Sequence, residues 1–181
     1  MKTTINKEFH VEEPIDKVWS NLSDPQKIVP CVPGAELTEM IDDQNFKGTV
    51  TMKFGPIKAQ YDGEIKMLEQ DATNHKLVMS GRGLDSKGKG SADMTMQGTL
   101  SEKDGGTDVQ FSMEVTIVGM LAQFGSRLIN DVSDQVLKQF IENFKASLAG
   151  EAVDNEMQAG SLVGSVVKSK IGSLFGGKKE E

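Results

Sequence analysis

Few side chains in this sequence are of the types that drive catalysis. Among 181 residues there are two histidines, His10 and His75, and one cysteine, Cys31. A thiol becomes a nucleophile when a neighbouring histidine or cation lowers its pKa. The stretch "VPCVPGAE" around Cys31 offers no such neighbour, so we interpret Cys31 as a small packed residue.

The remaining chemical motifs are also weak. His10 falls in a strand-like segment and His75 in the turn-like "ATNHK", so the sequence gives no reason to bring them together. The glycine-rich "GRGLDSKGKG" (81–90) lacks the strand-to-helix context that creates a phosphate site. We find no phosphate loop, dinucleotide fingerprint or zinc-type cluster. We therefore expect no metal, no covalent cofactor and no catalytic residue.

Methionine is the unusual residue type. Six methionines fall on the apolar positions of segments that alternate with period two: Met52, Met67, Met79, Met94, Met96 and Met113. Thioether side chains are flexible and polarizable, and they suit surfaces that adapt to a ligand. Strand interiors usually favour β-branched and aromatic residues instead. We expect a ligand cavity, with a solid core as the alternative.

These methionines belong to a series of predicted strands. A first strand covers "TTINKEFHV", and a helix opened by Pro14 follows it. Alternating segments then occur at 46–54, 57–67, 76–85, 91–100 and 107–117, separated by turn-forming residues. This pattern is typical of antiparallel hairpins with one apolar face and one polar face.

From Met120 the apolar period changes to that of a helix, which we expect to end near Gly150. One broad antiparallel sheet needs a cover for its apolar face, and a single long helix can provide it. We therefore predict an α+β grip, in which the sheet curves around the last helix.

The stretch "LSDPQKIVPCVPGAE" (22–36) holds three of the five prolines. Asp24 and Pro25 suit the start of a second short helix. Pro30 and Pro33 should bias Val29 and Val32 away from helix, so that the chain turns at Gly34 into a strand. We predict a stiff rim at the cavity entrance, formed by Ile28, Val29, Pro30, Cys31, Val32 and Pro33.

Charge and composition exclude several classes of protein. The net charge of −7 argues against general nucleic-acid binding, which depends on cationic contacts to phosphates. The N-terminus shows no signal peptide, and no run approaches the roughly 20 apolar residues of a membrane-spanning helix. A cytoplasmic location is the expectation.

The C-terminal segment differs from the rest. Residues 150–160 are small and polar and are predicted to be a linker, followed by a tail at 161–181 with a charge of +2. As a helix, residues 162–175 would be about 21 Å long, too short to span a bilayer. We expect the tail to lie at the surface of a membrane; packing on its own domain or on a partner protein is the alternative. The residues expected to dock are Leu162, Val163, Val166, Val167, Lys168, Lys170, Ile171, Leu174, Phe175, Lys178 and Lys179.

Three features together resemble a known family: "DPQKIVPCVPGAE", the run of hairpins and "VTIVGMLAQFGSRLI". Residues 1–149 are similar to the CoxG family of carbon monoxide dehydrogenase accessory proteins, within the START-like (SRPBCC, Bet v 1-like) superfamily. The resemblance implies the helix-grip fold: a curved seven-stranded antiparallel sheet, two short helices after the first strand and a long C-terminal helix.

The resemblance also implies a function. Members are associated with molybdenum hydroxylases of the CO dehydrogenase type, and are thought to bring them to the cytoplasmic face of the membrane and to handle an isoprenoid quinone. We thus expect a non-catalytic, peripherally membrane-associated protein that binds a hydrophobic quinone or lipid. Its cavity residues are expected to be Met52, Phe54, Tyr61, Met67, Met79, Met94, Met96, Phe111, Met113, Phe124 and Leu128.

Two other functions stay open. One is a START-like enzyme of the cyclase or hydratase type, which would need an acid–base pair inside the cavity. Tyr61, with Glu69 and Asp85 at strand ends, is the limited support for it. The other is a scaffold with a solid core that only tethers a partner.

Overall fold

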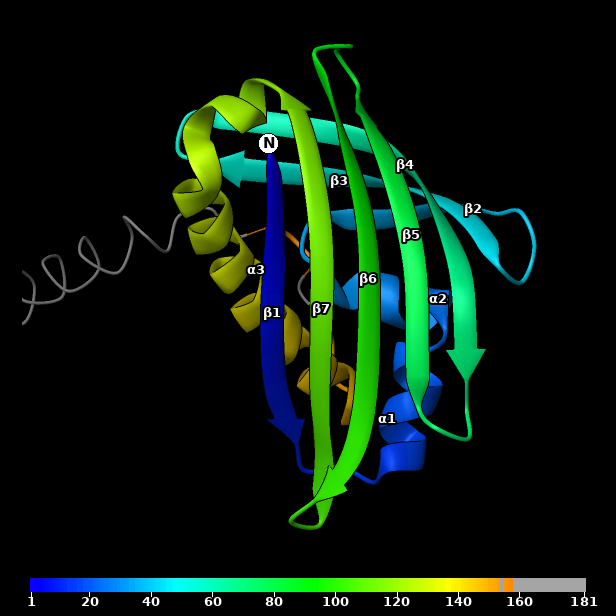
Figure 1. Cartoon of the computed structure of the whole chain (residues 1–181). Coiled ribbons are helices and arrows are strands. Elements are labelled where there is room, and N and C mark those ends of the chain that lie inside the picture. Colours follow the sequence, from blue (N-terminus) through cyan, green and yellow to red (C-terminus); the bar gives the residue numbers. More distant parts are fainter. Residues whose placement is uncertain (154, 158–181) are drawn as a thin grey trace, which may run out of the picture.

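A seven-stranded antiparallel sheet curves around one long helix in the computed structural model, which describes residues 1–153 and 155–157 (Figure 1). The spatial order of the strands is β1-β7-β6-β5-β4-β3-β2. Along the chain the elements are β1 (Lys2–Val11), α1 (Ile15–Leu22), α2 (Pro25–Ile28), η1 (Val29–Cys31), β2 (Ala35–Met40), β3 (Asn45–Phe54), β4 (Ile57–Asp71), β5 (Lys76–Asp85), β6 (Gly90–Lys103), β7 (Gly106–Gly119), η2 (Met120–Phe124) and α3 (Gly125–Leu148).

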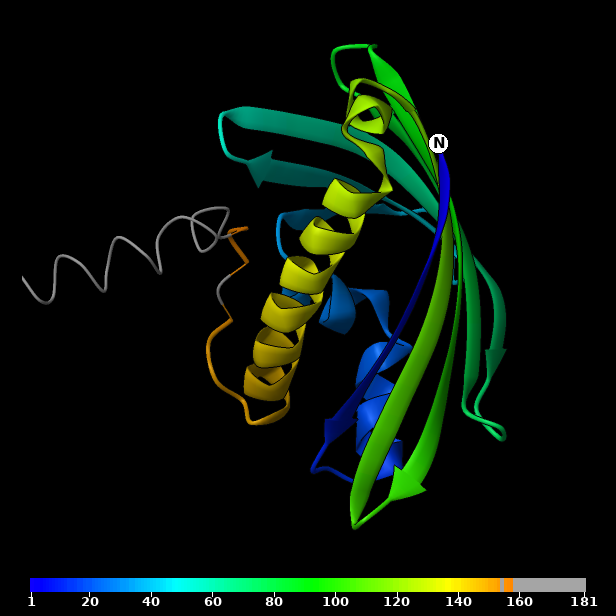
Figure 2. The same ribbon diagram turned by 60° about the vertical axis from the view of Figure 1, so that its left-hand side comes forward.

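The period-two pattern predicted β3 to β7 correctly. Each of the five alternating segments lies within one strand, and consecutive strands from β2 to β7 pair as antiparallel neighbours. β1 joins the far edge by pairing with β7. Helix α3 crosses the apolar face of the sheet, with α1 and α2 beside its C-terminal half (Figure 2). The predicted α+β helix-grip is confirmed.

The start of the long helix differs from the prediction. Met120–Phe124 forms a separate 3₁₀ turn, and α3 begins only at Gly125. Gly119 has φ +104° and Gly125 has φ +75°, so the chain bends through a left-handed conformation on each side of η2. The helical spacing of apolar residues continues through this break, which is why periodicity alone placed the start too early.

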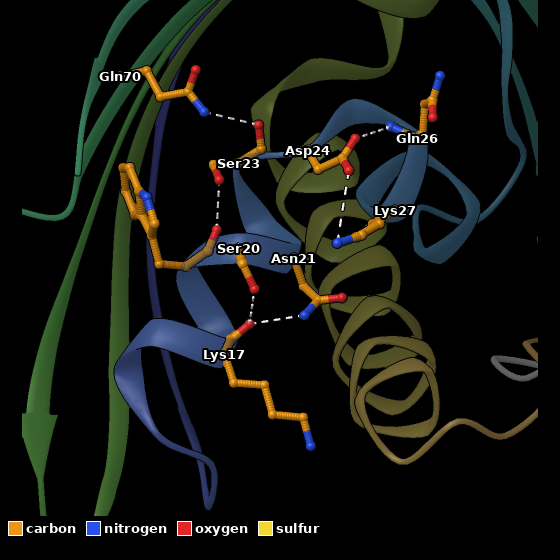
Figure 3. Close-up of polar contacts among 9 residues, drawn as sticks. Lys17, Ser20, Asn21, Ser23, Asp24, Gln26, Lys27 and Gln70 are labelled. Atoms are coloured by element: carbon orange, nitrogen blue, oxygen red, sulfur yellow. Dashed lines mark hydrogen bonds and ion pairs between the residues drawn. The ribbon is translucent and has the colours of Figure 1, made fainter.

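The junction of α1 and α2 is held by side-chain hydrogen bonds (Figure 3). Asp24 caps α2 by accepting the backbone N–H of Gln26 at 3.0 Å, and Pro25 occupies the first turn, both as predicted. Ser23 Oγ donates to the carbonyl of Trp19 at 2.7 Å. Gln70, on β4, donates to the carbonyl of Ser23 at 3.1 Å and so ties the junction to the sheet.

The prediction for the proline stretch is half right. Val32 is extended (φ −80°, ψ 115°), but Val29 is helical (φ −57°, ψ −42°) and begins η1. The steric bias against helix before a proline was overcome because η1 continues the turn of α2 without a break. Gly34 then turns the chain at φ +76°, as expected.

Three glycines align across neighbouring strands where the sheet bends. Gly48 on β3 pairs with Gly63 on β4, which pairs with Gly83 on β5. Glycine in a strand interior marks a sharp bend or a close backbone approach. A Cβ on Gly48 would lie 2.6 Å from the carbonyl oxygen of Glu36 on β2, so a close approach exists here. From this row the β3–β4 hairpin sweeps toward α3 (Figure 2).

Much of the buried core in the described part of the chain falls into two separate clusters. The first joins Val11, Val18, Cys31, Leu100, Val109, Phe144 and Leu148, with Phe9 and Trp19 packed against it. The second joins Ala59, Tyr61, Ile117 and Leu121 near η2. Phe9 contacts Phe140 and Phe144 edge-on, which fixes α3 over β1.

Candidate ligand-binding face

Four methionines form one continuous row across the sheet. Strand register places Met67 opposite Met79, Met79 opposite Met96, and Met96 opposite Met113, with Ile5 of β1 next in line. Neighbouring strands lie about 4.8 Å apart, so the four thioethers span about 14 Å. The sequence placed these residues on one face, but only the register shows that they are adjacent.

The row lies between the two core clusters. The four methionines are on the same face of the sheet as Leu100 and Val109 of the first cluster and Ile117 of the second. Met67 is buried, whereas Met79, Met96 and Met113 are only partly buried. Among the described residues, neither cluster includes any of the four. The middle of the face that α3 crosses is therefore apolar and incompletely covered.

Gly81, beside this row, has no side chain, and two longer neighbouring side chains fill the space above it. It pairs with Met94 on β6 and with Ile65 on β4. A Cβ on Gly81 would lie 2.6 Å from Ile65 Cδ1 and 3.0 Å from Met94 Cε. The two longer side chains thus occupy the space above the glycine, so that this part of the face is shaped by mobile side-chain ends.

The other predicted cavity residues have different surroundings. Met52, Met94, Phe111 and Leu128 are partly buried, and Phe54 lies at the end of β3 opposite Ile57. Tyr61 is buried in the second cluster. Phe124 is exposed on η2. By register, Met94 and Phe111 lie beside the methionine row, whereas Met52 pairs with Ala59 and lies with Tyr61 and Phe124 toward the η2 end.

Sequence reasoning missed one ion pair on this face. Lys7 pairs with Phe111 across β1 and β7, and so shares the face of the methionines. Its ammonium contacts the carboxylate of Asp134 on α3. A lysine at an apolar position, between Ile5 and Phe9, is the signal that could have identified it. The pair gives the edge of an otherwise apolar region one cation and one anion.

An acid–base pair suited to catalysis gains little support. Tyr61 and Asp85 are register partners, but the Asp85 carboxylate accepts the backbone N–H of Lys89 at 3.0 Å in its own turn. Burial, together with the negative charge of Asp85, raises the pKa of Tyr61, so its hydroxyl stays protonated at neutral pH. Glu69 forms an ion pair with Lys76 at 3.2 Å.

The predicted rim is partly a packed corner. Cys31 and Pro33 are buried, Ile28, Val29 and Val32 are partly buried, and Pro30 is exposed. Burial raises the pKa of the Cys31 thiol, and a hydrogen bond with Ser147 offsets this only in part, so Cys31 is not an activated nucleophile. An entrance at this stretch stays a prediction.

A hollow of about 550 Å³ lies on the other side of the sheet. Charged side chains line much of it, including Glu64, Arg82, Asp93 and Glu114. Arg82 pairs with Asp93 at 3.7 Å, and Lys2 pairs with Glu114 at 3.0 Å. Phe46, Ile65, Gly81 and Met94 also belong to its lining, but its many charged side chains suit an apolar ligand less well than the methionine side, which we therefore take as the candidate binding face. Among the described residues no cluster of His, Cys, Asp or Glu could hold a metal ion.

The segment predicted to be a linker is anchored to the domain. The carbonyl of Asn155 accepts the backbone N–H of Gly34 at 2.8 Å, and its side chain donates to the carbonyl of Ala35 at 2.7 Å. The carbonyl of Glu156 accepts from Gln139 of α3 at 2.5 Å, and Met157 Sδ accepts the N–H of Lys53 at 3.3 Å. We call residues 155–157 the strap.

The predicted tail, 161–181, lies outside the described residues. Among the residues that the structure does describe, no helix is long and apolar enough to cross a membrane.

Comparison with protein families gives a match over most of the chain. The family model for CoxG, the G subunit of carbon monoxide dehydrogenase, matches residues 8–149, which include every described strand and helix from α1 to α3. No curated protein matches this sequence.

Solved structures share the fold at low sequence identity. A conserved protein of Geobacillus kaustophilus superposes with a TM-score of 0.70 at 22% identity, over 82% of this chain and 96% of that one. A protein of Rhizobium leguminosarum gives a TM-score of 0.59 at 14% identity, over 83% and 97%. The protein Ara h 8.0201 gives 0.54 at 15% identity, over 83% and 100%. The fold is therefore the Bet v 1-like helix-grip.

Proposed function

The chain belongs to the CoxG family of carbon monoxide dehydrogenase, and on that premise we propose that it is a non-catalytic accessory protein that binds a hydrophobic ligand against the methionine row. The ligand class is an isoprenoid quinone or a lipid. The protein docks on the cytoplasmic face of the membrane through residues 161–181, and it serves a molybdenum hydroxylase of the CO dehydrogenase type.

The observation that supports ligand binding is the position of the row. A solid core would bury its central side chains, but Met79, Met96 and Met113 stay partly accessible between two fully packed clusters. Flexible thioethers can adjust to a planar ring or to an isoprenoid chain. Burying apolar ligand surface on them releases about 25 cal/mol per Å².

Lys7 and Asp134 support a ligand with one polar end. The pair lies next to Ile5, which ends the row on β1. A quinone or lipid has an apolar body and polar oxygens at one end, and the Lys7 ammonium can donate to those oxygens. The orientation that follows places the polar end toward β1 and the apolar body along the methionines.

The first experiment identifies the ligand. The full chain is purified from its native host and examined by native mass spectrometry and by organic extraction. We expect a co-purified quinone or lipid at a substantial fraction of one per chain. A protein that is empty, and that also fails to take up added decylubiquinone, would refute ligand binding and favour the tethering scaffold.

Filling variants test where the ligand binds. Met96→Phe and Met113→Phe add volume to the centre of the row and should lower decylubiquinone loading at least about tenfold. Met96→Leu conserves volume and should retain loading. Gln97→Phe adds a ring on the opposite face of the same strand and is the matched control, since Gln97 is exposed. Equal loading by all four variants would contradict the assignment.

A further inference from the structure

Three loops lie toward one end of the domain. These are residues 53–58 between β3 and β4, 85–90 between β5 and β6, and 118–127 around η2, which together we call the basic end. Gly90 pairs with Gly119, and a Cβ on Gly119 would lie 2.2 Å from the carbonyl oxygen of Lys89. Leu121 of η2 packs with Ala59 of β4. In Figures 1 and 2 the β5–β6 turn and η2 lie in the upper part of both views, and the β3–β4 hairpin extends from there to one side.

The charge of this end is opposite to that of the chain. It contains five cations, Lys53, Lys58, Lys87, Lys89 and Arg127, and one carboxylate, Asp85, for a net +4 in a protein of net −7. The remainder of the chain therefore carries −11. The Asp85 carboxylate is already engaged by the backbone N–H of Lys89.

Among the described residues these five cations have no ionic partner. Within the described part of the chain, none of them lies within 4.0 Å of a carboxylate oxygen. Most described lysines elsewhere are paired, such as Lys17 with Glu13 at 3.1 Å and Lys76 with Glu69 at 3.2 Å; Lys66, Lys138 and Lys145 are the exceptions. The basic end thus presents positive charge that its own domain does not neutralise.

Exposed apolar side chains accompany these cations. Leu84 is 54% exposed, Val118 56%, Met120 44% and Phe124 41%. Leu84 and Val118 flank Ser91 in the sheet register, and Met120 and Phe124 occupy η2. Apolar groups mixed with lysines are the composition of surfaces that lie in a membrane interface.

The strap ends at the same end of the domain. Met157 Sδ accepts the N–H of Lys53, and Asn155 and Glu156 fix the preceding residues on Gly34, Ala35 and Gln139. The last described residue, Met157, is therefore held on β3 at the basic end.

We propose that the basic end of the domain itself contacts the membrane, against an anionic leaflet and beside the tail. This rests on the proposed membrane docking and deepens it, because it gives the domain one orientation. The cations are attracted to anionic headgroups, while the acidic remainder is repelled from them. Phe124 and Met120 would enter the interface, and the η2 end of the ligand face would lie next to the lipid.

Vesicle flotation of the full chain tests this. The probes are vesicles of phosphatidylcholine alone and vesicles that contain phosphatidylglycerol. Lys87→Glu with Lys89→Glu, and separately Phe124→Asp, should weaken binding to the anionic vesicles at least about tenfold. Lys138→Glu with Lys145→Glu makes the same charge change at exposed positions of α3 and should change binding less than about threefold.

A labelling experiment gives a second readout that does not depend on disruptive variants. Cys31 is buried and should not react in the folded protein, so a new cysteine can be labelled selectively. Ser86→Cys in the basic end and Ser101→Cys near the β6–β7 hairpin both replace exposed serines. With an environment-sensitive dye, only the Ser86→Cys protein should show blue-shifted, enhanced emission on anionic vesicles.

The outcomes separate this proposal from tail docking. If the wild-type chain binds no vesicles, both are wrong. A second outcome is that the wild-type chain binds, the double variant Leu174→Asp, Phe175→Asp abolishes binding, and the basic-end variants bind like wild type. If the dye on Ser86→Cys also shows no change, the tail docks alone and the proposal for the basic end is wrong. If the chain instead forms a dimer that Phe124→Asp dissociates, without vesicle binding, the surface belongs to a second copy and the proposal is overturned.

Discussion

The side-chain amide of Asn143 donates a buried hydrogen bond of 3.1 Å to the backbone carbonyl of Cys31, 112 positions away. One residue is on α3 and the other ends η1. The bond therefore holds the proline stretch on the long helix. Gln139, one turn earlier, holds the strap at Glu156 in the same manner.

Asn143→Ala should lower the free energy of unfolding by about 1–3 kcal/mol, because the Cys31 carbonyl would remain buried without its donor. Asn130→Ala is the matched control: it makes the same change at an exposed position of the same helix and should stay within about 0.5 kcal/mol. Urea denaturation measures both. Equal effects of the two changes would show that the buried bond has no special role.

Gly34→Ala should destabilise the protein by more than about 2 kcal/mol. Gly34 has φ +76°, and a Cβ there would lie 2.1 Å from the carbonyl oxygen of Thr51. Gly88 has a similar φ of +69° but open space around it, so Gly88→Ala should cost only about 1 kcal/mol. Thermal unfolding compares the two variants, and a ranking in the reverse order would contradict the close approach at Thr51.

The Cys31 thiol should react with a disulfide reagent at pH 8 at least about a hundredfold more slowly in the folded chain than in urea. Its side chain is fully buried, and burial raises its pKa. The thiolate is thus disfavoured in the folded state, and stability from this residue is lost as pH rises above the thiol's ordinary value of 9.0. Rapid native labelling would show that the proline stretch opens readily.

Two hairpin turns should make the protein sensitive to acid. Asp42 accepts the backbone N–H groups of Gln44 and Asn45, and these bonds lower its pKa. Asp71 accepts from the side chain and backbone of Asn74, which lower its pKa in the same way. A lowered folded-state pKa contributes stability above the ordinary value of 3.8, which is lost as pH falls through the folded pKa.

The double variant Asp42→Ala, Asp71→Ala should therefore be less stable than wild type at pH 7, and the difference should shrink toward pH 2. Equilibrium unfolding at both pH values measures it. A difference that does not change with pH would mean that the turns depend on something other than the two carboxylates.

The strands and the cap of α2 were predictable because local physics decides them. Alternation fixes which face each residue takes, and Asp24 followed by Pro25 favours a helix start through local capping. The start of α3 was not predictable in this way, since the apolar spacing continues across the left-handed bend at Gly125. Val29 also escaped prediction, because η1 continues α2 despite Pro30.

The residues of the candidate site could be predicted from the sequence, but their alignment across the strands could not. The phase of the strands placed the methionines on one face, but the register that aligns Met67, Met79, Met96 and Met113 depends on turn lengths and on the irregularity between Met67 and Glu69. The strap had no local signal, since its bonds join residues far apart in sequence, such as Asn155 and Gly34. Contacts of this kind require the folded chain.

The row of methionines has a chemical cost. A thioether gains an oxygen when it meets peroxide, and the resulting sulfoxide is polar. Met79, Met96 and Met113 are accessible, whereas Met67 is buried, so oxidation would reach those three first. The thioethers that make this face suitable for apolar molecules therefore also make it sensitive to oxidants, which would turn it polar as each methionine is oxidised.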